Sequence, residues 1–129
     1  MQNKKIISTL KAPAAIGPYS QAIEINNLIF TSGQIPLDPV SGQIVSDDFS
    51  EQALQCLYNI KGILSEQSLS LNHIVKLTVY LIDLSNFEKL NIIFERFFNE
   101  KYPARSVLEV SRLPKDVKIE IEAIFYNEN

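Results

Sequence analysis

The sequence predicts a single α+β domain over residues 1–129, with a mixed β-sheet and two helices packed on one face of that sheet. Three observations lead to this fold class. A chain of 129 residues fits one domain of ordinary size. Alternating segments and amphipathic helical segments follow one another in the order ββ–α–β–α–ββ. Because each helical segment has a single apolar stripe, the two helices can cover only one face of a sheet.

The first part of the chain is predicted to form a β-hairpin followed by a long loop. Residues 21–25 alternate in part between apolar and polar side chains, and residues 28–31 form a second, mostly apolar segment. Asparagines at 26–27 suit a tight turn, since asparagine tolerates the positive φ that hairpin turns demand. Residues 32–42 hold two prolines and two glycines and are predicted to be a loop. One extra strand is expected over residues 6–9.

Capping signals and apolar spacing predict the two helices. The first has Asp48 as its N-cap with Glu51 three residues later, as in a capping box. Its apolar stripe is Phe49, Ala53, Leu57, Ile60 and Leu64. The second helix is expected to start at Ser85 and to end before Pro103, because proline interrupts a helix. The residues expected to be buried on it are Phe87, Leu90, Phe94 and Phe97.

Three further strands are predicted over residues 74–82, 106–110 and 117–125. Alternation in the first assigns to the buried face Val75, Leu77, Val79 and Leu81. Alternation in the last assigns to that face Val117, Ile119, Ile121, Ala123 and Phe125. The opposite face then carries Thr78, Tyr80, Glu120 and Glu122. A polar sheet face meets either water or another subunit, and periodicity alone favours water.

Composition excludes several classes of function. The net charge of −3 weakens any interpretation as a general nucleic-acid binder, which needs a basic patch. The sequence has no apolar run of the roughly 20 residues that span a membrane, so an intracellular protein is expected. Cys56 is the only cysteine and His73 the only histidine, which excludes an intrachain disulfide and a multi-histidine metal site. Cys56 lies within a helical pattern, which favours a buried thiol over a nucleophile paired with His73.

Three side chains are candidates for chemistry, each with a plainer alternative, and position in the pattern alone favours the plainer one for Arg105 and Glu120. Arg105 follows a proline and opens a strand, which suits bidentate binding of a carboxylate; the alternative is a charge at the rim of the sheet. Glu120 shares a strand face with Glu122, where partial burial would raise its pKa and suit proton transfer; the alternative is a solvated charged face. Tyr19, in a rigid Gly-Pro-Tyr-Ser turn, suits a pocket wall or a packed surface equally.

Three motifs together resemble the Rid (YjgF) family of reactive intermediate imine deaminases, and within it the RidA subgroup. The first motif is AAIGPYSQA at residues 14–22, and the second is SGQIPLDP at residues 32–39. The third comprises PARS at residues 103–106, LP at 113–114 and VKIEIEAI at 117–124. The resemblance covers nearly the whole chain, with the motifs in the family's order and spacing.

The resemblance implies a fold like that of the small trimeric chorismate mutases. Members of the family are homotrimers whose sheets pack toward a central barrel, with active sites in the clefts between subunits. The resemblance therefore implies that a neighbouring subunit, rather than water, covers the polar face of the sheet. The implied reaction is hydrolysis of a 2-imino acid, or its enamine tautomer, to a 2-oxo acid and ammonia. The implied substrates are 2-iminopropanoate, formed from 2-aminoacrylate, and 2-iminobutanoate, whose removal protects enzymes that use pyridoxal phosphate.

By analogy with the family, Arg105 binds the substrate carboxylate together with the backbone N–H of Val107, and Glu120 positions water and moves protons. The implied lining residues are Tyr19, Ser32, Gly33 and Asn91. Neither a metal nor a cofactor is implied, and a cytoplasmic protein with no nucleic-acid or membrane partner is expected. Many relatives have a cysteine where this chain has Val107, and activity is expected to survive because the family uses mainly the backbone there.

Two other functions stay open at this level. The first is a regulatory trimer that binds 2-oxo acids without turnover, for which Arg105 alone would suffice. The second is an RNA-cleaving translation inhibitor, a role attached to some relatives. The charge of −3 and the presence of only three arginines disfavour the second.

Overall fold

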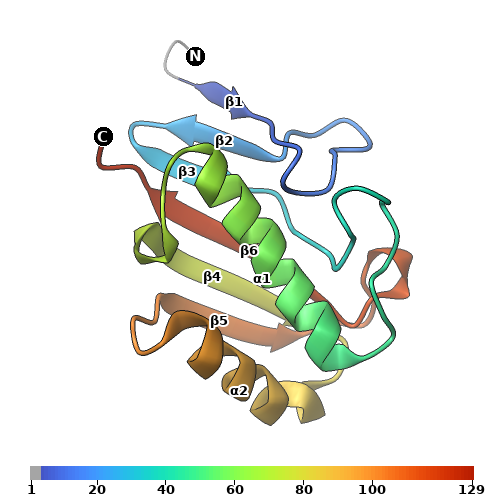
Figure 1. Ribbon diagram of the computed structural model, residues 1–129. Coiled ribbons are helices and arrows are strands. Elements are labelled where there is room, and N and C mark those ends of the chain that lie inside the picture. The colour runs from blue at the N-terminus through green and yellow to red at the C-terminus, as the bar shows by residue number, and fades with distance from the viewer. Residues whose placement is uncertain (1–3) are drawn as a thin grey trace.

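The computed structural model describes residues 4–129, and its elements follow the predicted order (Figure 1). The strands and α-helices are β1 (Lys5–Ile7), β2 (Ala22–Ile25), β3 (Leu28–Thr31), α1 (Phe49–Glu66), β4 (Ile74–Leu81), α2 (Phe87–Phe98), β5 (Ala104–Glu109) and β6 (Ile119–Tyr126). Short 3-10 helices are η1 (Leu71–His73), η2 (Leu84–Asn86) and η3 (Pro114–Asp116). The extra strand expected near the N-terminus is present as β1, although it is shorter than predicted.

The strands form one mixed sheet in the order β1-β2-β3-β6-β4-β5. The pairs are antiparallel except β4 with β5, which are parallel because α2 carries the chain back between them. Both α-helices lie on the same face of the sheet (Figure 1), so the predicted fold class is confirmed. Neither α-helix covers the opposite face.

The hairpin turn has the predicted chemistry, and the first helix has the predicted N-cap without the full capping box. Asn26 and Asn27 have φ values of 49° and 68°, the left-handed values of a two-residue hairpin turn. Asp48 caps α1 by accepting a hydrogen bond from the backbone N–H of Glu51 at 3.0 Å. The Asp48 N–H donates to the hydroxyl of Ser46 at 2.9 Å instead of to Glu51, whose carboxylate accepts from that hydroxyl at 2.8 Å. The whole predicted stripe is buried against the sheet, namely Phe49, Ala53, Leu57, Ile60 and Leu64.

β4 departs from the predicted alternation at its first residues. The pattern predicts Val75 on the buried face, but Val75 is 47% exposed and Ile74 is buried in its place. A β-bulge between Ile74 and Lys76 adds one residue opposite β6, and such an insertion moves a side chain to the other face. Beyond the bulge the prediction is right, because the side chains of Leu77, Val79 and Leu81 are buried.

α2 differs from the prediction at both ends. The predicted start, Ser85, belongs to η2, and the α-helix begins at Phe87. Phe87 is 39% exposed rather than buried, because its ring lies against Arg105 instead of the core. At the other end Phe98 enters the core in place of Phe97, which is only half-buried. The remaining predicted core positions, Leu90 and Phe94, are buried.

The last two strands are confirmed with shifted bounds. β5 begins at Ala104, earlier than predicted, so Arg105 lies within the strand. β6 begins at Ile119 because Val117 is the C-cap of η3, within which Lys115 has a left-handed φ of 56°. The predicted buried series is nevertheless correct at Val117, Ile119, Ile121, Ala123 and Phe125.

Gly62 of α1 lies directly against the N-terminal loop, so a substitution at this position tests how the loop packs on the helix. A Cβ at this position would collide with the backbone carbonyl of Lys11. We expect Gly62→Ala to lower the free energy of unfolding by about 1–3 kcal/mol, because overpacking against backbone strains the loop. Alanine in place of glycine normally stabilises a helix by up to about 1 kcal/mol. Urea unfolding measures the change, with exposed Lys61→Ala as control, and a more stable Gly62→Ala protein would contradict the packing described.

Candidate functional site

Arg105 lies at the edge of the sheet, on the face that carries the helices. It pairs in parallel register with Leu77, whose side chain is buried under those helices. Its guanidinium carbon lies 5.0 Å from the ring centre of Phe94 and 5.3 Å from that of Phe87. Within residues 4–129 no carboxylate pairs with it, and burial alone lowers its pKa. A half-buried, unpaired guanidinium is costly for folding and is typical of a site for an anion.

A cavity of about 400 Å³ opens beside this guanidinium. Its lining consists of Asn91, Phe94, Glu95, Tyr102, Pro103 and Arg105. Asn91 lies four residues after Phe87, on the same side of α2, which directs it toward the same space. The structure therefore brings the Asn91 amide and the Arg105 guanidinium together at one cavity.

Glu120 lies on the opposite face of the sheet. It stands in register with Tyr80 of β4, and its neighbours Ile119 and Ile121 have their side chains buried on the helix side. Glu120 itself is half-buried, and this burial, followed by the negative charge of Glu122, raises the pKa of its carboxyl group. A carboxyl group with a raised pKa suits proton transfer near neutral pH.

Glu120 lines a second and larger cavity, of about 510 Å³. Three of the residues that the family resemblance implied, Tyr19, Ser32 and Gly33, line this cavity as well. Its apolar lining is Pro13, Ala14, Ile16, Ile35, Leu37 and Pro114. Mostly apolar walls with a few converging polar groups are typical of small-molecule sites.

Gly33 lets the loop after β3 lie directly against the Glu120 carboxylate. A Cβ on Gly33 would overlap the carboxylate oxygen and lie 2.8 Å from its carbon. The loop is fixed at this point, because the backbone N–H of Gln34 donates to the carbonyl of Ile121 at 2.7 Å. The Ile121 N–H donates back to the Gln34 carbonyl at 3.0 Å. A side chain at position 33 would therefore displace the carboxylate rather than the loop.

Two buried amides that sequence analysis missed hold the walls of the larger cavity. Gln21 donates to backbone carbonyls within residues 9–13, the segment that leads into one wall. Asn59, fully buried in α1, donates to the carbonyls of Ile35 and Leu37 at 3.2 and 3.1 Å. Their partners are loop carbonyls distant in sequence, so no local pattern identifies these side chains as anchors.

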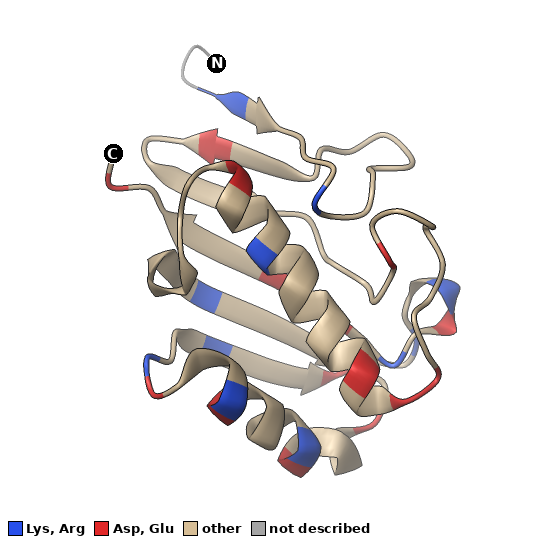
Figure 2. Cartoon of the chain, in the orientation of Figure 1, with Lys and Arg blue, Asp and Glu red and all other residues tan. Residues whose placement is uncertain are grey.

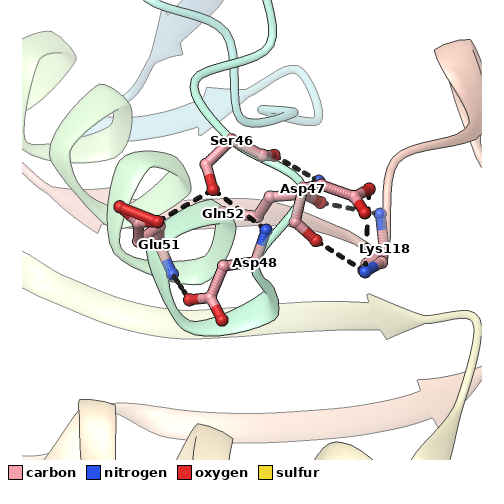
Figure 3. Close-up of polar contacts among 6 residues, drawn as sticks. All are labelled: Ser46, Asp47, Asp48, Glu51, Gln52 and Lys118. Atoms are coloured by element: carbon pink, nitrogen blue, oxygen red, sulfur yellow. Dashed lines mark hydrogen bonds and ion pairs between the residues drawn. The ribbon is translucent and has the colours of Figure 1, made fainter.

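A polar cluster fixes the start of β6, two residues before Glu120 (Figure 3). The backbone N–H of Lys118 donates to Gln52 of α1 at 2.8 Å, and the Gln52 amide donates to the carbonyl of Ser46 at 2.9 Å. The Lys118 ammonium donates to the carbonyl of Asp47 and lies 3.7 Å from its carboxylate. These bonds join the start of α1, the loop before it and β6 into one unit that holds the strand of Glu120.

Glu122, the other acidic residue on this face, already has a partner. The hydroxyl of Tyr80 donates to its carboxylate at 2.8 Å, and this bond raises the pKa of the tyrosine. Glu120 has no comparable bond among the residues that the structure describes. Of the two carboxylates, Glu120 is therefore the one whose oxygens are available to a ligand.

Arg105 and Glu120 thus belong to two separate cavities. They face opposite sides of the sheet, and the two cavities share no lining residue. Val107 follows on the same side of β5 as Arg105 and packs partly against the core. The Arg105 cavity is lined by Asn91 and Arg105, and the Glu120 cavity is lined by Tyr19, Ser32, Gly33 and Glu120. Within one chain these two charged groups do not face the same small ligand.

Phe87 and Lys115 are neighbours of the site that sequence analysis missed. The helical pattern counts Phe87 as core, and only the fold reveals that its ring meets Arg105. Lys115 lines the Glu120 cavity because its left-handed backbone turns the chain there. The Leu113-Pro114 pair marks a turn in the sequence, but nothing in the sequence indicates a positive φ at a lysine.

The remaining candidates take structural positions. Cys56 is fully buried, its thiol contacts the carbonyl of Ile119 at 3.8 Å, and burial raises the pKa of the thiol. His73 contacts Ser70 and Glu128 at the start of β4, away from both cavities. Across residues 4–129 no cluster of His, Cys, Asp or Glu could hold a metal ion. In that same part of the chain no helix is long and apolar enough to cross a membrane.

Within residues 4–129, a mixed six-stranded sheet with two helices on one face, an arginine without a carboxylate partner and a glutamate beside a cavity define a small α+β protein with a candidate site for small anionic ligands. Residues 9–126 match the family model described as Endoribonuclease L-PSP. The chain belongs to this family, and the resemblance to Rid proteins is thereby confirmed.

Three relatives show how close the similarity is. A RutC family protein of Pyrococcus abyssi is 56% identical, over 97% of this chain and 98% of its own length. A 2-iminobutanoate/2-iminopropanoate deaminase of Salmonella typhimurium is 52% identical, over 93% of this chain and 95% of its own. The crystal structure of Escherichia coli TdcF with bound serine has a TM-score of 0.90 at 46% identity, covering 95% of this chain and 99% of that one.

Proposed function

We propose that the protein hydrolyses reactive 2-imino acids, or their enamine tautomers, to 2-oxo acids and ammonia. The proposed substrates are 2-iminopropanoate, formed from 2-aminoacrylate, and 2-iminobutanoate. The relative from Salmonella typhimurium carries this activity in its name. We place the reaction in the cytoplasm, where it protects enzymes that depend on pyridoxal phosphate.

The single observation that carries this proposal is the state of Arg105. Its guanidinium is half-buried, unpaired within residues 4–129 and stacked on aromatic rings beside a cavity. A planar fork of this kind binds a carboxylate through two parallel hydrogen bonds. Arg105 is the proposed ligand of the substrate carboxylate, assisted by the backbone N–H of Val107 and by the Asn91 amide.

We propose further that the active protein is a homotrimer and that each site lies between two subunits. Arg105 and Glu120 face opposite sides of one sheet, so a second copy is needed to bring an arginine and a glutamate to one ligand. The face that carries Glu120 also exposes large apolar side chains, namely Phe30, Leu108 and Tyr126. Such side chains favour burial against a neighbouring subunit rather than contact with water.

In the proposed mechanism, a water molecule adds to the imine carbon, and the Glu120 carboxylate takes a proton from that water. Glu120 returns that proton to the nitrogen, which gives a carbon bearing both hydroxyl and amino groups. A second proton moves from the hydroxyl to the amino group, the C–N bond breaks, and the C=O bond of the 2-oxo acid forms as ammonia leaves. One group that alternates between base and acid suffices for these steps, and such a group contributes about 10²–10⁴-fold.

The lining residues have supporting roles in this proposal. Tyr19 and Ser32 form the wall beside Glu120, and Ser32 is held by donating to the carbonyl of Ser20 at 2.6 Å. Gly33 leaves room for the carboxylate. Neither metal nor cofactor enters the reaction, because an imine carbon is already electrophilic.

The Gly33→Ala variant tests the placement of Glu120. The added methyl group displaces the carboxylate, and a displacement of about 1 Å in an active site costs up to about 10²-fold in rate. We expect kcat for 2-iminobutanoate to fall by about 10- to 100-fold, with little change in thermal unfolding because a flexible side chain gives way. Ser41→Ala, in the exposed part of the same loop, is the control. Unchanged turnover in Gly33→Ala would contradict the role of Glu120.

The turnover assay tests the proposal as a whole. An amino-acid oxidase generates 2-iminobutanoate in the presence of semicarbazide, which traps the imine as an absorbing semicarbazone. Catalytic amounts of the protein are expected to suppress semicarbazone formation. Unaltered trapping across several imines would reject the deaminase function and leave a 2-oxo-acid-binding regulatory trimer as the candidate to test.

RNA cleavage is the second candidate, because the description of the matching family names an endoribonuclease. Basic and acidic residues are interspersed on both helices (Figure 2), and the net charge is −3. An RNA-binding surface instead concentrates basic residues. Steeply salt-dependent binding of RNA would favour this candidate over the deaminase.

A further inference from the structure

We propose that Phe87 and Phe94 are positioning residues for Arg105: their rings hold the guanidinium from two sides and leave its N–H edge free for the ligand carboxylate. The proposal rests on the carboxylate-binding role proposed for Arg105. It adds two residues that neither the family motifs nor the sequence pattern assign to the site.

The geometry of α2 places the two rings as a clamp. Phe87 and Phe94 are seven residues apart, which is about two helical turns, so both project from one side of the helix. Seven residues advance a helix by about 10.5 Å. The guanidinium carbon lies 5.3 Å from the ring centre of Phe87 and 5.0 Å from that of Phe94, so both rings contact the same cation.

Two aromatic rings support the Arg105 guanidinium. No carboxylate pairs with the guanidinium in residues 4–129, and free arginine side chains lose about 2 kcal/mol of rotamer entropy when fixed. A cation over an aromatic face gains about 0.5–2 kcal/mol, which offsets part of that loss before the ligand arrives. The clamp therefore prepares the arginine for binding rather than neutralising it.

The two rings differ in burial, which separates positioning from core packing. Phe94 is 4% exposed and contributes to the core, whereas Phe87 is 39% exposed and does not belong to the core cluster. The stability of the fold therefore gives little reason for a phenylalanine at position 87. Its contact with Arg105 provides that reason, and a substitution there leaves the core in place.

The test compares Phe87→Leu with Phe97→Leu, the same substitution on the same helix but away from Arg105. We expect Phe87→Leu to raise KM for 2-iminobutanoate, and Kd for the product 2-oxobutanoate by calorimetry, by about 3- to 20-fold. Its kcat and its urea unfolding midpoint stay close to those of the wild type. Phe87→Tyr, which keeps the ring, restores KM and Kd, and Phe97→Leu leaves both unchanged.

The outcomes separate this proposal from the proposed function. Wild-type turnover with equal KM and Kd in Phe87→Leu would overturn the clamp and leave the deaminase intact. Absent turnover with 2-oxobutanoate still bound, more weakly in Phe87→Leu, would reject the deaminase and support the clamp. A fall in kcat and in the unfolding midpoint, with KM and Kd unchanged, would show a structural role for Phe87 and overturn the clamp. Wild type that neither turns over imines nor binds 2-oxobutanoate would overturn both.

Discussion

Replacing Arg105 by alanine is expected to lower kcat/KM for 2-iminobutanoate by about 10²- to 10⁴-fold. The substitution removes two charge-assisted hydrogen bonds to the substrate carboxylate, each of which is worth about 1.5–3 kcal/mol. Because the guanidinium has no ion-pair partner within residues 4–129, its removal leaves no carboxylate of that part of the chain unpaired. The loss therefore falls on binding, and steady-state kinetics is expected to show it mainly as a raised KM.

Two further arginine variants make this result specific. Arg105→Lys keeps the charge but loses the planar fork, so we expect it to recover only part of the lost affinity. Arg112→Ala removes an arginine that is exposed and paired with Asp116 at 2.8 Å, and it is expected to retain full activity. Equal KM values for wild type and Arg105→Ala would exclude Arg105 as the carboxylate ligand.

Glu120→Gln is expected to lower kcat by about 10²- to 10⁴-fold while the affinity for 2-oxobutanoate changes little. Glutamine keeps the shape of the side chain beside Gly33 but neither takes nor gives a proton. This split also separates an enzyme from a regulatory trimer that binds 2-oxo acids without turnover. Loss of turnover with retained binding supports catalysis, whereas unchanged turnover would remove Glu120 from the mechanism.

The pH dependence of kcat gives an independent view of the same carboxyl group. Burial and the charge of Glu122 both raise the pKa of Glu120 above its ordinary value of 4.5. Since water activation needs the ionised form, activity is expected to rise with pH through this raised pKa. Glu122→Gln removes the like charge, lowers the pKa of Glu120 and should move the acid limb of the profile to lower pH. If the acid limb of the profile did not move, a group other than Glu120 would be responsible for it.

Much of the fold follows from local patterns in the sequence. Helix α1 was predictable because Asp48 caps it and every position of its apolar stripe is buried. The alternation of β6 was predictable for the same reason, since one face of the strand lies under the helices. Val75 was not predictable, because a β-bulge shifts the alternation without any signal in residue type. Phe87 was assigned to the core because periodicity cannot tell a core contact from a contact with an arginine.

The candidate site was predictable as a set of residues but not as an arrangement. The motifs identify Tyr19, Ser32, Gly33 and Glu120, and the structure gathers these four around one cavity. That Arg105 faces the other side of the sheet follows only from the parallel register of β5 with β4. The amide anchors Gln21 and Asn59 contact loops distant in sequence, which no local pattern reveals.

The most direct test of the shared site mixes two inactive variants. Arg105→Ala and Glu120→Gln subunits are refolded together in equal amounts, and turnover of 2-iminobutanoate is measured against each variant alone. If each site takes its arginine from one subunit and its glutamate from the next, random mixing leaves about a quarter of the sites intact and restores about a quarter of wild-type activity. If both residues served one site from the same chain, no subunit would hold a complete pair. The mixture would then be as inactive as its components, which would contradict the account.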